Sequence, residues 1–153
     1  MIWVMDQESI KRYITSALDG VEVVSADGND FFFYGSQRMM PFATIVANDL
    51  YDKASDLGRA GVFRLNVGVG KETYRELLGA QPKGPGPGGV VETGDDFTAL
   101  DRIMPHPVYG HLSWVCVLNP SEVTFERVKG LLAEAHGIAA RRGGRGREEE
   151  VTG

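Results

Sequence analysis

The stretch Gly61-Val62-Phe63-Arg64-Leu65-Asn66-Val67 alternates along its length and predicts a β-strand with two different faces. Successive side chains of a strand point to opposite sides, so positions 63, 65 and 67 are expected to face the core. Arg64 and Asn66 then share the other face. They lie roughly 6.6 Å apart along the strand, so one ligand could contact both.

Other segments with strand character lie on both sides of this stretch, at residues 21–26, 31–34, 42–48 and 113–118. The turn sequence Asp27-Gly28-Asn29-Asp30 joins the first two of them. This hairpin-like spacing favours a mostly antiparallel sheet.

Helical periodicity marks the two ends of the chain. Residues 6–18 place an apolar side chain at every third or fourth position, with Asp6 as the expected N-cap. Residues 71–78 predict a short helix, and Asn119-Pro120-Ser121-Glu122 predicts the start of the last one, with Asn119 as N-cap. The expected fold class is α+β, with the N- and C-terminal helices packed on one face of the sheet. The other face is expected to be uncovered and to present Arg64 and Asn66.

The length of 153 residues predicts one domain, which we place at residues 1–142, followed by a disordered tail at 143–153. Residues 79–94 are rich in proline and glycine and predict an exposed, flexible loop, either a lid or a tolerated insertion.

Composition limits the location and the partners. No apolar run is long enough for a membrane helix, and residues 1–6 do not resemble a signal peptide. The single cysteine, Cys116, excludes an internal disulfide and fits a cytoplasmic protein. Up to Ala140 the chain has 12 Lys and Arg against 18 Asp and Glu, which disfavours nucleic acid as a partner. The oligomeric state stays open.

His106 is the candidate for acid–base chemistry. It stands between two prolines in Pro105-His106-Pro107-Val108-Tyr109, which should hold its ring on a rigid loop before the strand that contains Trp114. Such a histidine can act as a general acid or base, anchor a ligand together with Tyr109, or simply bond a neighbouring backbone group.

Other residue types give weaker indications. Cys116 fits a small buried apolar residue, and no metal site or cofactor is predicted, because the three histidines match no ligand spacing. Gly70 and Lys71 either bind an anion at a helix start or form a tight turn. The run Phe31-Phe32-Phe33-Tyr34 either belongs to the core or lines an apolar pocket with Trp114. The aspartates at 49, 52 and 56 are expected in solvent.

Several segments together resemble an uncharacterised bacterial family of unknown function. The segments that carry this resemblance are residues 38–46, 61–69, 99–102, 105–109 and 113–120. The last third is more distantly similar to MmcQ/YjbR-like proteins, where a loop containing His-Pro or Lys precedes a Trp-Val-x-Val strand and a closing helix. That similarity implies a small frataxin-like α+β layer. It implies little about activity, and the DNA binding suggested for the wider group fits this acidic chain badly.

Three functions follow as hypotheses. The first is a module that binds a small polar or anionic ligand without turnover, through Arg64, Asn66, His106, Tyr109 and Trp114. The second is a small enzyme in which His106 is the general acid or base and Arg64 stabilises negative charge. The third is a weak nucleic-acid binder. The alternative for Arg64 is that it contacts no ligand and forms a surface ion pair with Asp101 or Asp49.

Overall fold

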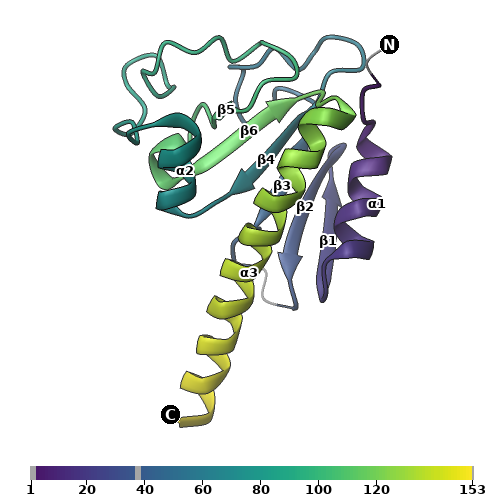
Figure 1. The fold of residues 1–153 in the computed structure, drawn as a ribbon, viewed down its shortest axis with the longest axis vertical. Coiled ribbons are helices and arrows are strands. Elements are labelled where there is room, and N and C mark those ends of the chain that lie inside the picture. The colour runs from purple at the N-terminus through teal and green to yellow at the C-terminus, as the bar shows by residue number, and fades with distance from the viewer. Residues whose placement is uncertain (1–2, 37–38, 153) are drawn as a thin grey trace.

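The computed structural model describes residues 3–36 and 39–152, with side chains as far as residue 143. One antiparallel sheet of six strands forms the body, in the spatial order β1-β2-β3-β4-β6-β5 (Figure 1). The strands are β1 (Val21–Ala26), β2 (Asn29–Tyr34), β3 (Ala43–Val46), β4 (Arg64–Gly68), β5 (Met104–Pro105) and β6 (Trp114–Leu118). The α+β class is thereby confirmed. Of the segments that carry the family resemblance, Arg38 lies outside the described residues.

The strand that contains Arg64 and Asn66 lies at the centre of the sheet. β4 pairs with β3 on one side and with β6 on the other. Arg64 stands opposite Val46 and Leu118, and Asn66 stands opposite Thr44 and Cys116. Both polar residues of β4 therefore have strand neighbours on either side.

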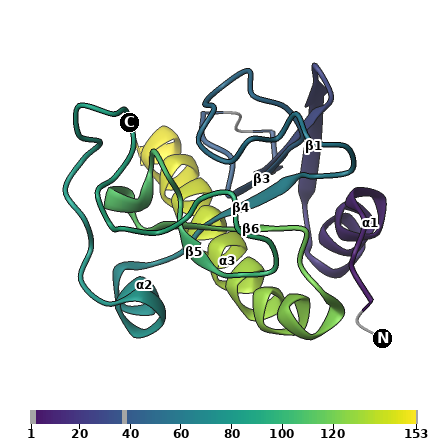
Figure 2. The same ribbon diagram turned by 90° about the horizontal axis from the view of Figure 1, so that it is seen from above.

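Three α-helices accompany the sheet: α1 (Gln7–Ala17), α2 (Lys71–Leu78) and α3 (Glu122–Thr152). A single-turn 3-10 helix, Gly110–Leu112, precedes β6. Buried residues of α1 and α3 pack with Leu65, Val67 and their strand neighbours in one apolar cluster. The two terminal helices thus cover the same face of the sheet, as expected, and α3 crosses that face diagonally (Figures 1 and 2).

The N-cap residue predicted from the sequence is found in α1 but not in α3. The Asp6 carboxylate accepts a hydrogen bond of 2.7 Å from the Ser9 amide, which confirms the predicted cap of α1. The prediction that Asn119 caps the last helix is wrong. α3 begins at Glu122, and the Ser121 hydroxyl accepts the amide of Thr124 at 3.2 Å.

Asn119 instead ties two strands together. It has a left-handed backbone with φ of 41°, a conformation that asparagine tolerates better than most residues. Its side-chain oxygen accepts the Phe63 amide, and its side-chain nitrogen donates to the Gly61 carbonyl, each at 2.9 Å. This double contact joins the end of β6 to the start of β4.

The second face of the sheet is not uncovered, and that expectation is wrong. The two long connections, residues 47–62 and 79–103, supply apolar side chains that pack on it. The buried members of this second cluster are Val46, Leu57, Val91, Phe97, Met104, Cys116 and Leu118. Segments without regular structure can cover a sheet when each supplies a few apolar anchors, which their polar composition conceals in the sequence.

The proline- and glycine-rich segment 79–94 is anchored at both ends. Gln81 donates a hydrogen bond of 2.5 Å to the Ser113 hydroxyl, and the Val91 amide donates to the Pro107 carbonyl at 2.8 Å. Val91 itself is buried. The segment is thus fixed to the residues that connect β5 to β6.

α3 continues through the segment that the sequence predicts to be a disordered tail, as far as Thr152. In Figure 1 its C-terminal end projects past the strands. The domain limit at residue 142 stays a prediction. Among the described residues, no helix is both long and apolar enough to cross a bilayer.

Candidate functional site

Arg64 is buried at the centre of a polar network inside the second face. Its guanidinium contacts both carboxylate oxygens of Asp52, at 3.0 and 2.8 Å. It also donates to the Ser55 hydroxyl and to the Asn66 side-chain oxygen, each at 2.9 Å. Asn66 in turn donates to the Thr44 hydroxyl at 2.9 Å. The partner of Arg64 is Asp52 rather than Asp101 or Asp49.

This network corrects the expected placement of the arginine and the asparagine. Arg64 and Asn66 are each 2% exposed, so neither presents its side chain to a ligand at the surface. Asp52, expected in solvent, has a side chain only 14% exposed. Burial alone would raise the pKa of Asp52, but the hydrogen bonds and charge of Arg64 outweigh it and hold that pKa below its usual value.

His106 is held as a neutral, buried ring. It is 4% exposed, and its Nδ1 accepts the backbone amides of Val108 and Tyr109, each at 3.0 Å. Burial, together with the positive charge of Arg64, lowers the pKa of His106 to about 3. A group with this pKa stays unprotonated near neutral pH, and the geometry therefore does not favour acid–base catalysis by His106.

The five residues predicted to bind a ligand are neighbours, but they do not surround one cavity. The His106 ring lies 5.0 Å from the Tyr109 ring and 6.4 Å from the Trp114 ring, measured between centroids. Tyr109 is half exposed on the outer side of this group. Of the five, only Trp114 also lines the pocket described next.

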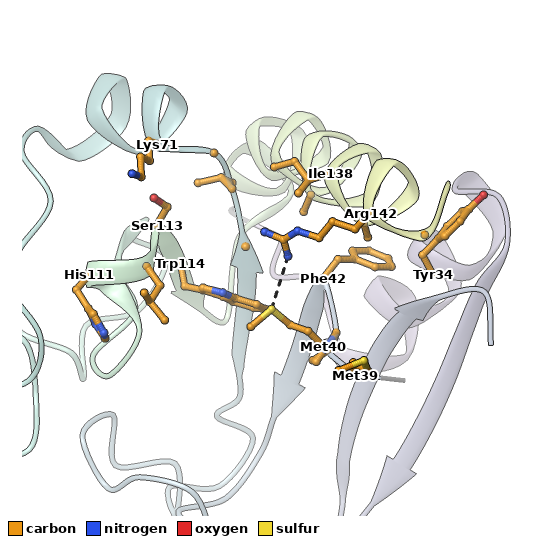
Figure 3. A pocket seen from close by; sticks show the side chains of 18 of the residues that line it. Tyr34, Met39, Met40, Phe42, Lys71, His111, Ser113, Trp114, Ile138 and Arg142 are labelled. Atoms are coloured by element: carbon orange, nitrogen blue, oxygen red, sulfur yellow. Dashed lines mark hydrogen bonds between the residues drawn. The ribbon is translucent and has the colours of Figure 1, made fainter. Parts of the chain in front are cut away.

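That pocket has a volume of about 680 Å³, within the range of small-molecule sites. It lies where the end of β4 and the start of β6 meet α3, α2 and the segment before β3 (Figure 3). We call it the Trp114 pocket. Its lining residues are Tyr34, Met39, Met40, Pro41, Phe42, Gly68, Val69, Gly70, Lys71, Gln81, His111, Leu112, Ser113, Trp114, Ala135, Ile138, Ala139, Arg142 and Gly143.

Among the described residues that line the Trp114 pocket, Arg142 and Lys71 carry a positive charge and none is an aspartate or a glutamate. Arg142 reaches from α3 toward Trp114 and Met40, while Lys71 stands on the α2 side (Figure 3). Within the described part of the chain Arg142 forms no ion pair. Its guanidinium donates to the sulfur of Met40 at 3.7 Å. A thioether is a weak acceptor, so this charge is poorly compensated.

The positive end of the α2 helix dipole is already compensated by a carboxylate of the protein itself. The Glu134 carboxylate of α3 accepts the Gly70 amide at 2.9 Å and the Thr73 hydroxyl at 2.5 Å. It therefore takes the place that an external anion would occupy at this helix start. The anion-binding interpretation of Gly70 does not fit this geometry, although the exposed Lys71 ammonium still lines the pocket.

Histidine and aromatic residues complete the wall. The Nδ1 atom of His111 is buried without a hydrogen-bond partner among the described residues, which leaves polar capacity at this wall unused. The sequence left two roles open for the aromatic run at residues 31–34, a pocket lining with Trp114 or the core. Tyr34 and Trp114 line the pocket. Phe32 and Phe33 belong to the core.

Arg142 and Met40 are two of the pocket residues for which the sequence interpretation proposed no role. Ala135, Ile138, Ala139 and Arg142 follow helical spacing along α3, so the stripe of its buried face leads directly to the arginine. Because the sequence predicts a disordered tail from residue 143, Arg142 falls at the very end of the predicted domain, where no site is expected. No local signal in the sequence brings Met40 to the same place.

The remaining reactive groups do not form a site. Among the described residues no three histidine, cysteine, aspartate or glutamate side chains lie close enough to hold a metal ion. Burial raises the pKa of the Cys116 thiol to about 12, which keeps it protonated and unreactive. Cys116 is thus the small buried residue that its apolar strand predicted.

Comparison with known proteins places the chain in a family without assigning an activity. No curated protein and no solved structure matches it, so the resemblance to MmcQ/YjbR-like proteins stays a prediction. Residues 5–148 match the model of a family described as "Family of unknown function (DUF6194)". The match covers nearly the whole chain, including the sheet, α1, most of α3 and the Trp114 pocket, and the protein therefore belongs to this family.

Proposed function

We propose that the protein is a binding module for a small anionic molecule, which it holds in the Trp114 pocket without chemical turnover. The observation that carries the proposal is the lining of this pocket, whose described residues combine Arg142 and Lys71 with mainly apolar side chains and include no aspartate or glutamate. The chain as a whole has a net charge of −5, so a cavity lined by positive charge is set apart from its average surface.

Electrostatics supports an acidic group on the ligand. A carboxylate or phosphate can form two parallel hydrogen bonds with a guanidinium, which a thioether sulfur cannot match. A ligand at Arg142 would replace the contact with Met40 by a charge-assisted one. Arg142 and Lys71 are both exposed, so solvent screens them, and their contribution is expected to decrease as salt rises.

The apolar part of the lining supports a hydrophobic body on the same ligand. Ile138 and Trp114 are two large apolar side chains of the pocket that are only partly buried, and covering them removes apolar surface from water. Burial of this kind contributes about 25 cal/mol for each Å². An amphipathic anion would use both features of the lining, whereas an inorganic anion would use only the cations.

The site differs from the one expected from the sequence, although the class of function is the same. Arg64 and Asn66 stabilise the second face from inside, and Trp114 carries the ligand contact instead. No observation favours the enzyme alternative. A cytoplasmic location is part of the proposal and rests on the unpaired cysteine.

A thermal-shift screen against carboxylates and phosphates of small-molecule size tests the proposal. A ligand present at 100 times its dissociation constant stabilises the fold by about 2.7 kcal/mol, which gives a clear shift. Each hit is repeated with Arg142→Gln and with Arg141→Gln. Arg141 is the matched control, because it is exposed on the same helix but does not line the pocket.

We expect the shift to be lost or strongly reduced in Arg142→Gln and to be unchanged in Arg141→Gln. Equal loss in both variants would mean that only general positive charge on α3 matters. A screen in which no anion stabilises the wild-type protein would overturn the proposal.

A further inference from the structure

Trp114 lies flat against the backbone at Gly68, and this contact fixes the position of the indole. The two residues face each other across β4 and β6. A methyl group built on Gly68 would lie 2.9 Å from Cε2, 3.0 Å from Cζ2 and 3.3 Å from Nε1 of the indole. Gly68 is not in the left-handed region, so the glycine is needed here for close packing rather than for its backbone angles.

The fixed indole is a rigid aromatic element inside the pocket. The His106 ring packs edge-on against it with an interplanar angle of 81°. The indole extends toward Met40, and the guanidinium of Arg142 lies across the cavity from it (Figure 3). Because the indole is held before any ligand arrives, little conformational freedom is lost on binding.

An aromatic ring, a thioether and a guanidinium together favour one kind of ligand. Aromatic pairs prefer offset or edge-to-face arrangements and gain energy beyond the area that they bury. Sulfur also makes favourable contacts with aromatic rings, and guanidinium groups bind acidic groups or stack on flat π-systems. A ligand with a saturated hydrocarbon chain would gain only the free energy of burying apolar surface against the same side chains.

We propose that the ligand is a planar aromatic acid, whose ring packs against Trp114 and Met40 and whose acidic group binds Arg142. The inference rests on the proposed function, since it names the ligand class of the same pocket. The acid is either a carboxylate attached to an aromatic ring or the phosphate of a nucleotide. Both present a flat ring and a negative charge.

Calorimetric titration with four probes tests the inference: 2-naphthoate, adenosine monophosphate, octanoate and 2-naphthalenemethanol. Octanoate has the charge without the ring, and the alcohol has the ring without the charge. We expect at least one of the two aromatic acids to bind about threefold to tenfold more tightly than octanoate, the range given by an aromatic pair. The better of the two identifies the source of the acid.

Two variants separate the role of the indole from that of the fold. Trp114→Leu removes the ring and retains an apolar side chain, while Gly68→Ala retains every side chain that is expected to contact the ligand but displaces the indole. We expect both to abolish the preference for the aromatic acid over octanoate. Unfolding scans of each variant confirm that it is folded at the temperature of the titration.

The outcomes distinguish this inference from the proposed function. If octanoate binds as tightly as the aromatic acids, the aromatic class is overturned while the anion-binding function stands. An aromatic preference that persists in both variants would also overturn it, because Trp114 would not be the cause. If none of the acids binds, or if the alcohol binds as tightly as 2-naphthoate, the proposed function and the inference both fail.

Discussion

The guanidinium of Arg64 and the carboxylate of Asp52 meet through two nitrogen–oxygen contacts of 3.0 and 2.8 Å inside the second face of the sheet. Asp52 belongs to the connection between β3 and β4, which has no regular structure of its own. The pair therefore fastens residues 47–62 to the central strand. The sequence predicts that Arg64 binds a ligand. In the structure it instead holds a loop against the sheet.

Replacement of Arg64 is expected to destabilise the fold. Arg64→Ala leaves Asp52 and Asn66 without their partner in a buried setting, and breaking a buried pair in this way costs about 3–5 kcal/mol. Chemical denaturation measures the loss. The matched control is Arg102→Ala, which removes an exposed arginine paired with Asp95 at 3.6 Å and should cost only a small fraction as much. Equal losses in the two variants would contradict the fastening role.

His106 is expected to make stability depend on pH below about 6.5. The unfolded chain protonates this histidine near pH 6.5, whereas the folded protein keeps it neutral until about pH 3. Between these values the unfolded state binds the extra proton, so stability falls as pH falls. The slope from this one group reaches at most about 1.4 kcal/mol per pH unit. The contribution is fully present above pH 6.5.

The variant His106→Asn isolates this effect. An asparagine oxygen can accept the amides of Val108 and Tyr109 but does not titrate. Urea denaturation at several pH values between 4 and 7 should show a smaller slope in the variant than in the wild type. Identical slopes would show that His106 is protonated in the folded state as readily as in the unfolded chain.

Cys116 is expected to be inert in the native protein. Its thiol is 1% exposed, and burial raises the pKa of the thiol to about 12, so almost no thiolate exists at neutral pH. A thiol reagent added at pH 8 should react at the rate of unfolding and should react at once in denaturant. Fast, complete modification of the folded protein would show that the loops over the second face open readily.

Glu134 is expected to stabilise the start of α2. Glu134→Ala removes the acceptor for the Gly70 amide and the Thr73 hydroxyl, a loss comparable to that of a helix cap, about 1 kcal/mol. Thermal or urea unfolding measures it. Glu126→Ala serves as control, because Glu126 is exposed on the same helix and contacts only the neighbouring Lys129 in the described structure. A control variant that loses as much stability would argue against the capping role.

Most of the regular structure was predictable from the sequence, because its signals are local, but the two-residue strand β5 was not. Alternation in β4 and helical spacing in α1 follow from the geometry of single elements, and the α+β class follows from their order. The cover of the second face was not predictable. Leu57, Val91 and Phe97 are isolated apolar residues in polar or glycine-rich segments, and nothing local indicates that they anchor those segments on the sheet.

The site was only partly predictable for the same reason. Trp114 and Tyr34 could be proposed as pocket residues from their aromatic character. The partner of Arg64 depends on how a loop folds back, and the sequence contains several aspartates that fit equally well. Arg142 and Met40 are about a hundred residues apart and meet only in the tertiary structure.

Ligand binding in the Trp114 pocket can be followed directly with the two tryptophans as reporters. The chain contains only Trp3 and Trp114, so a proton–nitrogen correlation spectrum has two indole signals, which Trp114→Phe assigns. Trp3 is 64% exposed and does not line the pocket. Titration with the anion found by the screen should shift the Trp114 signal in a saturable manner and leave that of Trp3 in place. A stabilising anion that leaves the Trp114 signal unmoved, or that shifts only Trp3, would show that the ligand does not bind in the Trp114 pocket.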